Sequence, residues 1–82
     1  MTFTVYILRD DTGRLYKGAT NDLDRRIREH KSGHTKTTRK MSGLHVVYKE
    51  EFVDWPKARR RELYLKSAAG RKFLKDKLSM SR

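Results

Sequence analysis

The sequence predicts one small α/β domain of the α+β type, with the element order strand, strand, helix, strand, helix, helix. Segments rich in β-branched and aromatic residues occur at the start and in the middle of the chain, and apolar residues recur at helical spacing after residues that cap helices. The length agrees, because 82 residues suffice for one modest core and not for two. Residues 1–82 are therefore treated as a single domain, and only Ser79 to Arg82 are expected to fray.

A β-hairpin is predicted at the start of the chain, because two strand-forming segments flank a turn sequence. If Gly13 takes the left-handed position of a three-residue loop, Tyr6 lies opposite Gly18 and on the same face as Tyr16. A two-residue loop would put the two tyrosines on opposite faces. The opposite, core-facing side is expected to hold Val5, Ile7 and Leu15. The three parts of the hairpin are Phe3 to Leu8, Asp10-Asp11-Thr12-Gly13 and Leu15 to Ala19.

The next element is a helix that Asn21 or Asp22 can cap and that runs to about Ser32, where Gly33 ends it. Apolar and polar residues share one stripe of this helix. Leu23 and Ile27 anchor the helix, while Arg26 and His30 lie one turn apart at the border of the buried face. The stripe consists of Leu23, Arg26, Ile27 and His30. The residues expected to point elsewhere are Arg25, Arg28 and Glu29.

Residues 33–43 show no usable period and predict a basic loop. Leu44 to Val53 then resumes as a strand, in which Leu44, Val46 and Tyr48 are expected to alternate on one face. The charged members of the loop include Lys36, Arg39 and Lys40.

Two helices are predicted after this strand. Asp54 caps the first, Pro56 lies in its first turn, and Gly70 ends it. A short last helix runs over 71–78. The stripe of the longer helix contains one charge, Glu62, and a charge at such a position must find a pocket, a partner or an ion. That stripe consists of Trp55, Ala58, Glu62, Leu65 and Ala69. The last helix offers Phe73, Leu74 and Leu78 as apolar contacts.

The charge balance indicates a polyanionic partner. The chain has 21 Lys and Arg residues against 10 Asp and Glu, with a net charge of +11 spread over its length, so nucleic acid is the first candidate. No apolar run approaches the roughly 18 to 20 residues that span a bilayer, which excludes a membrane-spanning protein. The absence of cysteine excludes disulfides and thiolate chemistry. A cytoplasmic location is expected, since the first residues also lack the apolar run of a signal peptide.

The residues Tyr6, Tyr16 and Arg26 follow one another at an even interval in this basic chain, which suggests phosphate chemistry. The candidate residues also have simpler interpretations. Tyrosine is a good strand former, and a histidine such as His30, taken alone, is more often a structural residue. Glu62 with Lys66 could be an ordinary surface pair on a helix. The joint spacing, and the place of Glu62 inside an apolar stripe, favour a functional role.

These residues match a known family. The chain resembles the GIY-YIG nuclease domain, and most closely its small single-domain members of the UPF0213 type. The resemblance implies a three-stranded antiparallel sheet flanked by helices. The matching residues are Thr4-Val5-Tyr6, Tyr16-Lys17-Gly18 with Thr20, Asn21-Asp22-Leu23, Arg26, His30, Gly33, and Glu62 with Lys66.

In such nucleases the two tyrosines and the helix arginine surround the scissile phosphate, and the late glutamate holds a divalent metal ion, Mg²⁺ or Mn²⁺. The resemblance implies these roles for Tyr6, Tyr16, Arg26 and Glu62. His30 can hold the phosphate or shuttle a proton. Tyr6 is the favoured general base, although a phenol with a pKa of about 10 needs a nearby cation to act at neutral pH. The residues expected to bind substrate are Lys17, Lys36, Arg39 and Lys66.

The predicted function is a divalent-metal-dependent DNA endonuclease of low intrinsic sequence specificity. DNA is favoured over RNA as the partner. Two alternatives stay open: a nucleic-acid-binding module without catalysis, and a nuclease that needs a protein partner for activity or targeting.

Overall fold

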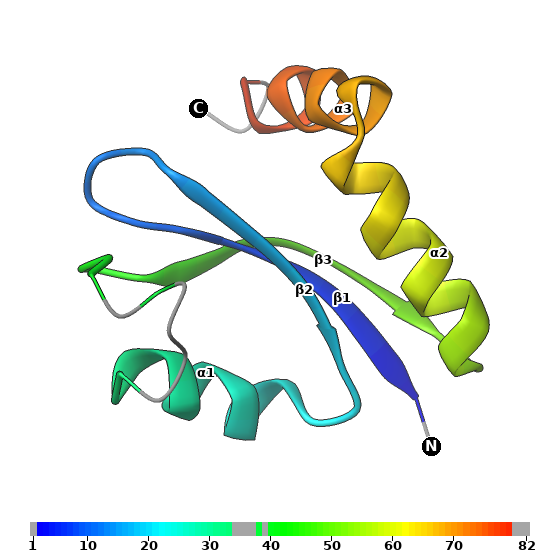
Figure 1. The fold of residues 1–82 in the computed structure, drawn as a ribbon, viewed down its shortest axis with the longest axis horizontal. Coiled ribbons are helices and arrows are strands. Elements are labelled where there is room, and N and C mark those ends of the chain that lie inside the picture. Colours follow the sequence, from blue (N-terminus) through cyan, green and yellow to red (C-terminus); the bar gives the residue numbers. More distant parts are fainter. Residues whose placement is uncertain (1, 34–37, 39, 80–82) are drawn as a thin grey trace.

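The computed structural model of the protein describes residues 2–33, 38 and 40–79. The strands form one antiparallel sheet in the order β2-β1-β3, which puts β1 in the centre and β2 at an edge. The predicted order of elements is confirmed. No helix in the described residues has the length and apolar character that crossing a membrane requires. The elements are β1 (Phe3–Arg9), β2 (Leu15–Thr20), α1 (Leu23–Lys31), β3 (His45–Phe52), α2 (Trp55–Lys66) and α3 (Ala68–Ser79) (Figure 1).

The turn between β1 and β2 has the predicted three-residue form. Gly13 has a φ of 91°, and its amide donates to the carbonyl oxygen of Asp10 over 3.0 Å. The Asp10 carboxylate accepts hydrogen bonds from the amides of Thr12 and Arg14, at 3.0 and 2.8 Å. Burial alone would raise the pKa of Asp10, but hydrogen bonds from these two residues lower it to about 2.

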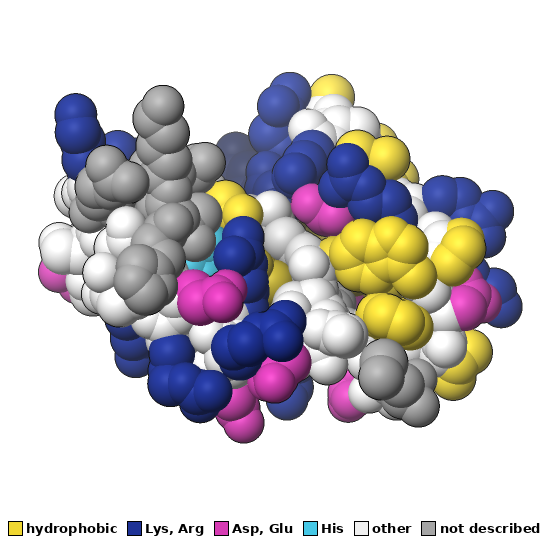
Figure 2. Space-filling view, turned by 60° about the horizontal axis from the view of Figure 1, so that its bottom comes forward, with side chains coloured by type: hydrophobic (Ala, Val, Ile, Leu, Met, Phe, Trp, Pro, Cys, Tyr) yellow, Lys and Arg dark blue, Asp and Glu magenta, His cyan; other side chains and the backbone are white. Residues whose placement is uncertain are grey.

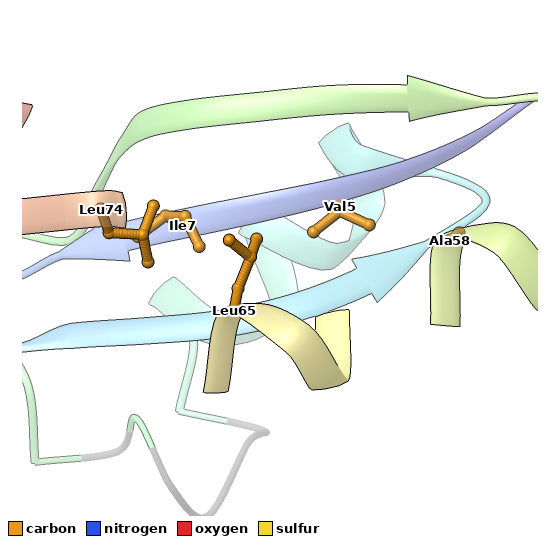
Figure 3. Packing of buried hydrophobic residues seen from close by; sticks show 5 residues of the cluster. All are labelled: Val5, Ile7, Ala58, Leu65 and Leu74. Carbon is orange, nitrogen blue, oxygen red and sulfur yellow. The ribbon is translucent and has the colours of Figure 1, made fainter. Parts of the chain in front are cut away.

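The sheet separates two hydrophobic cores. Successive strand residues point to opposite faces, so Val5 and Ile7 enter one core while Tyr6 and Leu8 enter the other. Helices α2 and α3 cover the first face, where Figure 3 shows side chains from both helices meeting those of β1. Helix α1 covers the second face. The first core is built on Val5, Ile7, Ala58, Leu65 and Leu74. The second is built on Tyr6, Leu8 and Leu44, with Tyr16, Leu23 and Ile27 packed against them.

A β-bulge changes the pattern of β3. Ile7 pairs with Tyr48 while its neighbour Leu8 pairs with Val46, so Val47 is an extra residue in the ladder. The prediction that Leu44, Val46 and Tyr48 alternate on one face is therefore wrong at Tyr48. Val46 packs in the α1 core, whereas Tyr48 packs in the core under α2 and α3.

The break between α2 and α3 lies at Ser67, and the prediction that Gly70 ends the helix is wrong. Ser67 has an extended backbone with a ψ of 170°, and its hydroxyl accepts a hydrogen bond from the Gly70 amide over 3.2 Å. A Cβ at Gly70 would lie 2.0 Å from the carbonyl oxygen of Tyr64, so this glycine allows the two helices to approach closely. The last helix is longer than predicted and includes Ser79, which was expected to fray. Ala69 is exposed and lies outside the buried stripe.

Arg61 fastens α2 to β3 and α3. Its Nε and Nη2 atoms donate to the two carboxylate oxygens of Glu50 over 2.8 and 3.0 Å. The guanidinium also stacks on the rings of Tyr64 and Phe73, at 5.0 and 4.9 Å from their centroids. Burial alone would raise the pKa of Glu50, but hydrogen bonds from Arg61 and Tyr48 lower it.

Candidate active site

Tyr6 and Tyr16 lie on one face of the hairpin, as the loop length predicts. Their ring centroids are 6.2 Å apart. Tyr6 is 1% exposed, and its ring lies directly over Gly18, since a Cβ at Gly18 would come within 2.6 Å of the Tyr6 hydroxyl oxygen. The glycine thus leaves room for the Tyr6 side chain to extend over the edge strand β2.

Helix α1 adds Arg26 and His30 to the two tyrosines. Asp22 caps the helix by accepting a hydrogen bond from the Arg25 amide over 3.1 Å. The packing of the apolar α1 residues then turns His30 toward the sheet, where it is 2% exposed. Its Nε2 atom lies 2.9 Å from the Tyr6 hydroxyl, and its ring centroid lies 4.7 Å from that of Tyr16. The prediction that Arg26 and His30 share one stripe is confirmed.

Three side chains form a buried hydrogen-bonded chain, Tyr6 to His30 to Thr38. The Nδ1 atom of His30 lies 2.8 Å from the Thr38 hydroxyl, and Thr38 is 1% exposed. Burial, with a contribution from Arg26, lowers the pKa of His30, so the imidazole is neutral at pH 7. Burial raises the pKa of Tyr6 to about 12, so the phenol keeps its proton. In one tautomer the Tyr6 hydroxyl donates to Nε2 and Nδ1–H donates to Thr38; in the other Nε2–H donates to Tyr6 and the Thr38 hydroxyl donates to Nδ1.

Arg26 lies on the solvent side of these residues, and Glu29 holds its side chain in place. The Nη1 atom of Arg26 donates to Glu29 Oε1 over 3.0 Å, and this contact, followed by hydrogen bonds to the two tyrosines, raises the pKa of Arg26. The prediction that Glu29 points elsewhere is wrong, because this residue lies one turn from Arg26 and pairs with it. The Arg26 side chain is 34% exposed and can reach a ligand from outside.

Glu62 approaches from the other side of the sheet. It is 6% exposed, and its neighbours on the same face of α2, Ala58 and Leu65, are fully buried. Its carboxylate accepts hydrogen bonds from Arg59 Nη1 over 2.6 Å and from Lys66 Nζ over 2.9 Å. The charge of Glu62 contributes to the raised pKa of Tyr6, as the last of several causes, so the two groups act on one region around β2. No contact joins Glu62 directly to the tyrosines among the described hydrogen bonds.

Cations gather next to Glu62. Burial, Arg71 and Lys66 lower the pKa of Lys17, in that order of effect, so the predicted substrate-binding residues Lys17 and Lys66 are neighbours. Figure 2 shows lysine and arginine side chains on both sides of a central band of backbone and small side chains. Lys36 and Arg39, the other two predicted substrate-binding residues, lie outside the described residues.

Comparison with known proteins identifies the family of this chain. A family model of the GIY-YIG catalytic domain matches residues 2–75. The chain belongs to the GIY-YIG family. It is similar to a UPF0213 protein of Autographa californica nuclear polyhedrosis virus, with 42% identity over 72 residues, which covers 84% of this chain and 68% of that protein. A UPF0213 protein of Clostridium perfringens is 41% identical over 63 residues, covering 76% of this chain and 68% of that protein.

A solved structure agrees with the GIY-YIG assignment. The solution NMR structure of a UPF0213 protein from Bacillus halodurans is 35% identical in sequence, with a TM-score of 0.58. The match covers 93% of this chain and 84% of that one. The resemblance drawn from the motifs and the fold that it implies are both confirmed.

Glu62 is the metal ligand that the sequence predicts for this GIY-YIG domain. In the part of the chain that the structure describes, no three His, Asp or Glu side chains gather into a metal-binding group. One carboxylate suits Mg²⁺ when phosphate oxygens and waters complete the octahedron. The two partners of Glu62 are about half exposed, Arg59 at 49% and Lys66 at 47%, and their long stems allow an ion to replace them. The residues present therefore fit such an ion.

Three residues that lie at the candidate active site were not predicted from the sequence. Thr38 lies in a loop without periodicity, and nothing in its neighbours indicates that its hydroxyl reaches His30. Arg71 joins Lys17 only because α3 folds back after Ser67. Glu29 could have been found, because acidic residues three positions after an arginine in a helix commonly pair with it.

Proposed function

We propose that the chain is an endonuclease that hydrolyses phosphodiester bonds of DNA with the help of Mg²⁺ or Mn²⁺. One observation carries the proposal: Tyr6, Tyr16, Arg26 and His30, which are far apart in the sequence, meet over the edge strand of a strongly basic domain. Hydrolysis of a phosphodiester requires an oriented water, stabilisation of charge on the phosphate and help for the departing oxygen. Membership in a family named for a catalytic domain supports the same function.

Arg26 is the proposed ligand of the scissile phosphate. Its guanidinium presents a planar fork that matches phosphate oxygens and stays charged at every relevant pH. Glu29 and the tyrosine hydroxyls fix the position of this fork before the substrate arrives. A group held in place beforehand stabilises developing charge without reorganising, and removing one such donor typically costs about 100-fold or more in rate.

Tyr16 is the proposed contact of the attacking water. Tyr6 was the favoured base in the sequence interpretation, but its hydroxyl is buried and its pKa is raised to about 12, and both features oppose that role. Tyr16 is half-buried and lies on the same face, so its hydroxyl can meet solvent. Tyr6 becomes a positioning residue, which orients Arg26 and His30. His30 is neutral, and its Nε2 atom shares a hydrogen bond with the Tyr6 hydroxyl that fixes the orientation of the phenol.

Glu62 is the proposed metal ligand, and Arg59 and Lys66 would then be free to contact phosphate groups. When bound, the ion acidifies a coordinated water and offsets the phosphate charge. Lys17, Lys66 and Arg71 provide an anchoring site for the strand on the α2 side of β2. Contacts of this kind position a nucleic acid without reading its sequence, which agrees with the proposed low specificity.

The proposal also covers the substrate, the partner and the cellular location of the protein. DNA is favoured over RNA as the substrate, and a protein partner could supply targeting. The cytoplasm is the proposed location, because a chain without cysteine needs no oxidising compartment.

The test is cleavage of plain, nicked and branched DNA, and of matched RNA, with Mg²⁺, Mn²⁺ or chelator. Glu62→Gln should reduce the rate by at least about 100-fold, and Tyr6→Phe by about 10-fold through the lost hydrogen bond. Glu51→Gln, which changes an exposed carboxylate of β3, serves as the matched control and should cleave normally.

Equal activity in all four proteins would identify a contaminating nuclease and refute the mechanism. Salt-dependent binding without turnover, unaffected by Glu62→Gln and by chelator, would instead support a nucleic-acid-binding module. Cleavage that appears only after addition of cell extract would support dependence on a partner.

A further inference from the structure

A pocket lies where β2 ends and α2 begins. Its volume is about 340 Å³. Its lining combines two aromatic rings and an alanine methyl group with the side chains of a threonine and an asparagine. None of the side chains assigned above to catalysis or metal binding lines it. The lining residues are Phe3, Ala19, Thr20, Asn21 and Trp55.

Trp55 makes this pocket unusual. It is the only tryptophan of the chain, and it is 43% exposed. Its ring packs edge-on against Phe3, with centroids 5.6 Å apart and an interplanar angle of 61°. Asp54 caps the helix turn that carries it, accepting a hydrogen bond from the Lys57 amide over 2.8 Å. The indole is therefore held in place while part of it faces solvent, which is the arrangement of a stacking platform.

Phe3 and Ala19 of the pocket pack on the α2 face of the sheet, whereas Tyr6 and Tyr16 pack on the α1 face, so a bound strand that reaches both sites crosses the edge strand β2. Thr20 is two residues beyond Gly18 on β2, and strand geometry places these residues roughly 7 Å apart. Gly18 and Ala19, which precede Thr20 on the edge strand, carry no bulky side chain. In Figure 2 a patch of hydrophobic side chains lies to the right of the central band, on the side where Figure 1 shows α2 beginning.

The surroundings favour a nucleic acid as the occupant. The domain carries a net charge of +11, and Arg59 follows Trp55 by one turn of α2 with a side chain that is 49% exposed. An aromatic platform inside a basic surface attracts a polyanion whose bases have flat faces. Asn21 offers an amide group that can hydrogen-bond to a base edge. An apolar peptide would gain nothing from the surrounding cations.

We propose that the pocket between Phe3 and Trp55 receives an unpaired nucleobase of the strand that is bound at Arg26, with the base stacked on the indole. This inference rests on the proposed function and sharpens it, because it makes DNA with an unpaired nucleotide beside the cleavage site the substrate class. A base inside a duplex is already stacked and would have to be extracted at a cost of a few kcal/mol. Flaps, overhangs and branch points offer unpaired bases without that cost.

The test uses the fluorescence of Trp55. The full chain is titrated, in chelator to prevent turnover, with an oligothymidylate of about eight nucleotides and with an abasic oligomer carrying the same number of phosphates. Stacking should quench the emission and make the oligothymidylate bind about 5- to 150-fold more tightly than the abasic oligomer. Trp55→Phe should retain part of this preference, measured by anisotropy of a labelled oligomer, and Trp55→Ala should lose it.

The matched control is Leu63→Ala, which removes another exposed apolar side chain of α2, 51% exposed, and should keep the full preference. Thermal melting of each variant separates lost stacking from lost folding, and Trp55→Phe keeps the test valid if Trp55→Ala does not fold. Equal binding of the two oligomers by the wild type would overturn the proposal. So would a folded Trp55→Ala variant that still prefers the oligothymidylate.

The two proposals can fail separately. Quenching and base preference without any cleavage would leave the pocket as a base-binding site and refute the nuclease. Cleavage of branched DNA at equal rates with normal and abasic nucleotides beside the junction would support the nuclease and refute the role of the pocket.

Discussion

Gly18→Ala tests whether the close contact between Tyr6 and β2 builds the site. The added Cβ would lie 2.6 Å from the Tyr6 hydroxyl oxygen and 2.7 Å from Cζ, both too short for carbon contacts, so the ring must move. Tyr6 is 1% exposed and hydrogen-bonded to His30, so the ring cannot move without repacking the α1 core.

The expected cost has two parts. Overpacking a filled core typically destabilises by about 1 to 3 kcal/mol, and the loss of the Tyr6 to His30 hydrogen bond adds about 1 kcal/mol. Relief of the glycine backbone entropy returns about 0.5 to 1 kcal/mol in a strand. We therefore expect a loss of about 1 to 3.5 kcal/mol in the free energy of unfolding, together with a loss of cleavage activity, because Arg26 and His30 both contact the displaced ring.

Urea denaturation of a double-mutant cycle isolates the contact. Tyr6→Leu removes the ring atoms that meet the new Cβ, so Gly18→Ala should be neutral or slightly stabilising in that background. Cleavage is compared only between folded proteins. A Gly18→Ala protein as stable and active as the wild type would contradict the reasoning, and so would an equal loss of stability in both backgrounds.

The other predictions concern stability and are measured by urea unfolding. The pKa of His30 is lower in the folded state, so the unfolded chain binds a proton first; stability should fall as the pH drops below about 6.5, and His30→Gln should flatten this slope. The pKa of Asp10 is about 2 in the folded state, so a further loss of stability is expected as the pH falls from about 4 to 2. The Asp10→Asn variant should not show this loss. Arg61→Leu leaves the partly buried Glu50 carboxylate without its two hydrogen bonds from the guanidinium and should lower the free energy of unfolding by about 1 to 2 kcal/mol. Arg61→Lys should recover little of this loss, and a fully stable Arg61→Leu protein would refute the reasoning. Leu65→Ala should cost about 2 to 5 kcal/mol, since its side chain is fully buried, and a smaller loss would mean that α2 and α3 close the cavity.

Local chemistry explains what the sequence predicts well. The position of Gly13 specifies the loop length, the loop length sets the register, and the register puts Tyr6 and Tyr16 on one face. The caps Asp22 and Asp54 mark the starts of α1 and α2 in the same way. These features depend on residues that are close together in the chain, so their patterns are visible without the fold.

Contacts between distant segments explain what the sequence does not predict. Gly70 has the residue type of a helix end, but its role is set by the carbonyl of Tyr64 across the turn between two helices. The bulge at Val47 depends on how β3 meets β1, and no turn residue marks it. The link from His30 to Thr38 likewise joins two side chains that no local sequence pattern relates. The individual roles of the site residues stay predictions until cleavage is measured.

The division of the sheet into two cores has a consequence for heat inactivation. The proposed phosphate-binding group depends on α1, whose apolar anchors Leu23 and Ile27 are only half-buried, whereas α2 holds Glu62 between fully buried Ala58 and Leu65. An element with weaker packing can open without unfolding the rest of the domain. Amide hydrogen exchange should then be faster in α1 than in α2. On heating, the protein should lose phosphate binding at temperatures where most of its secondary structure is still intact.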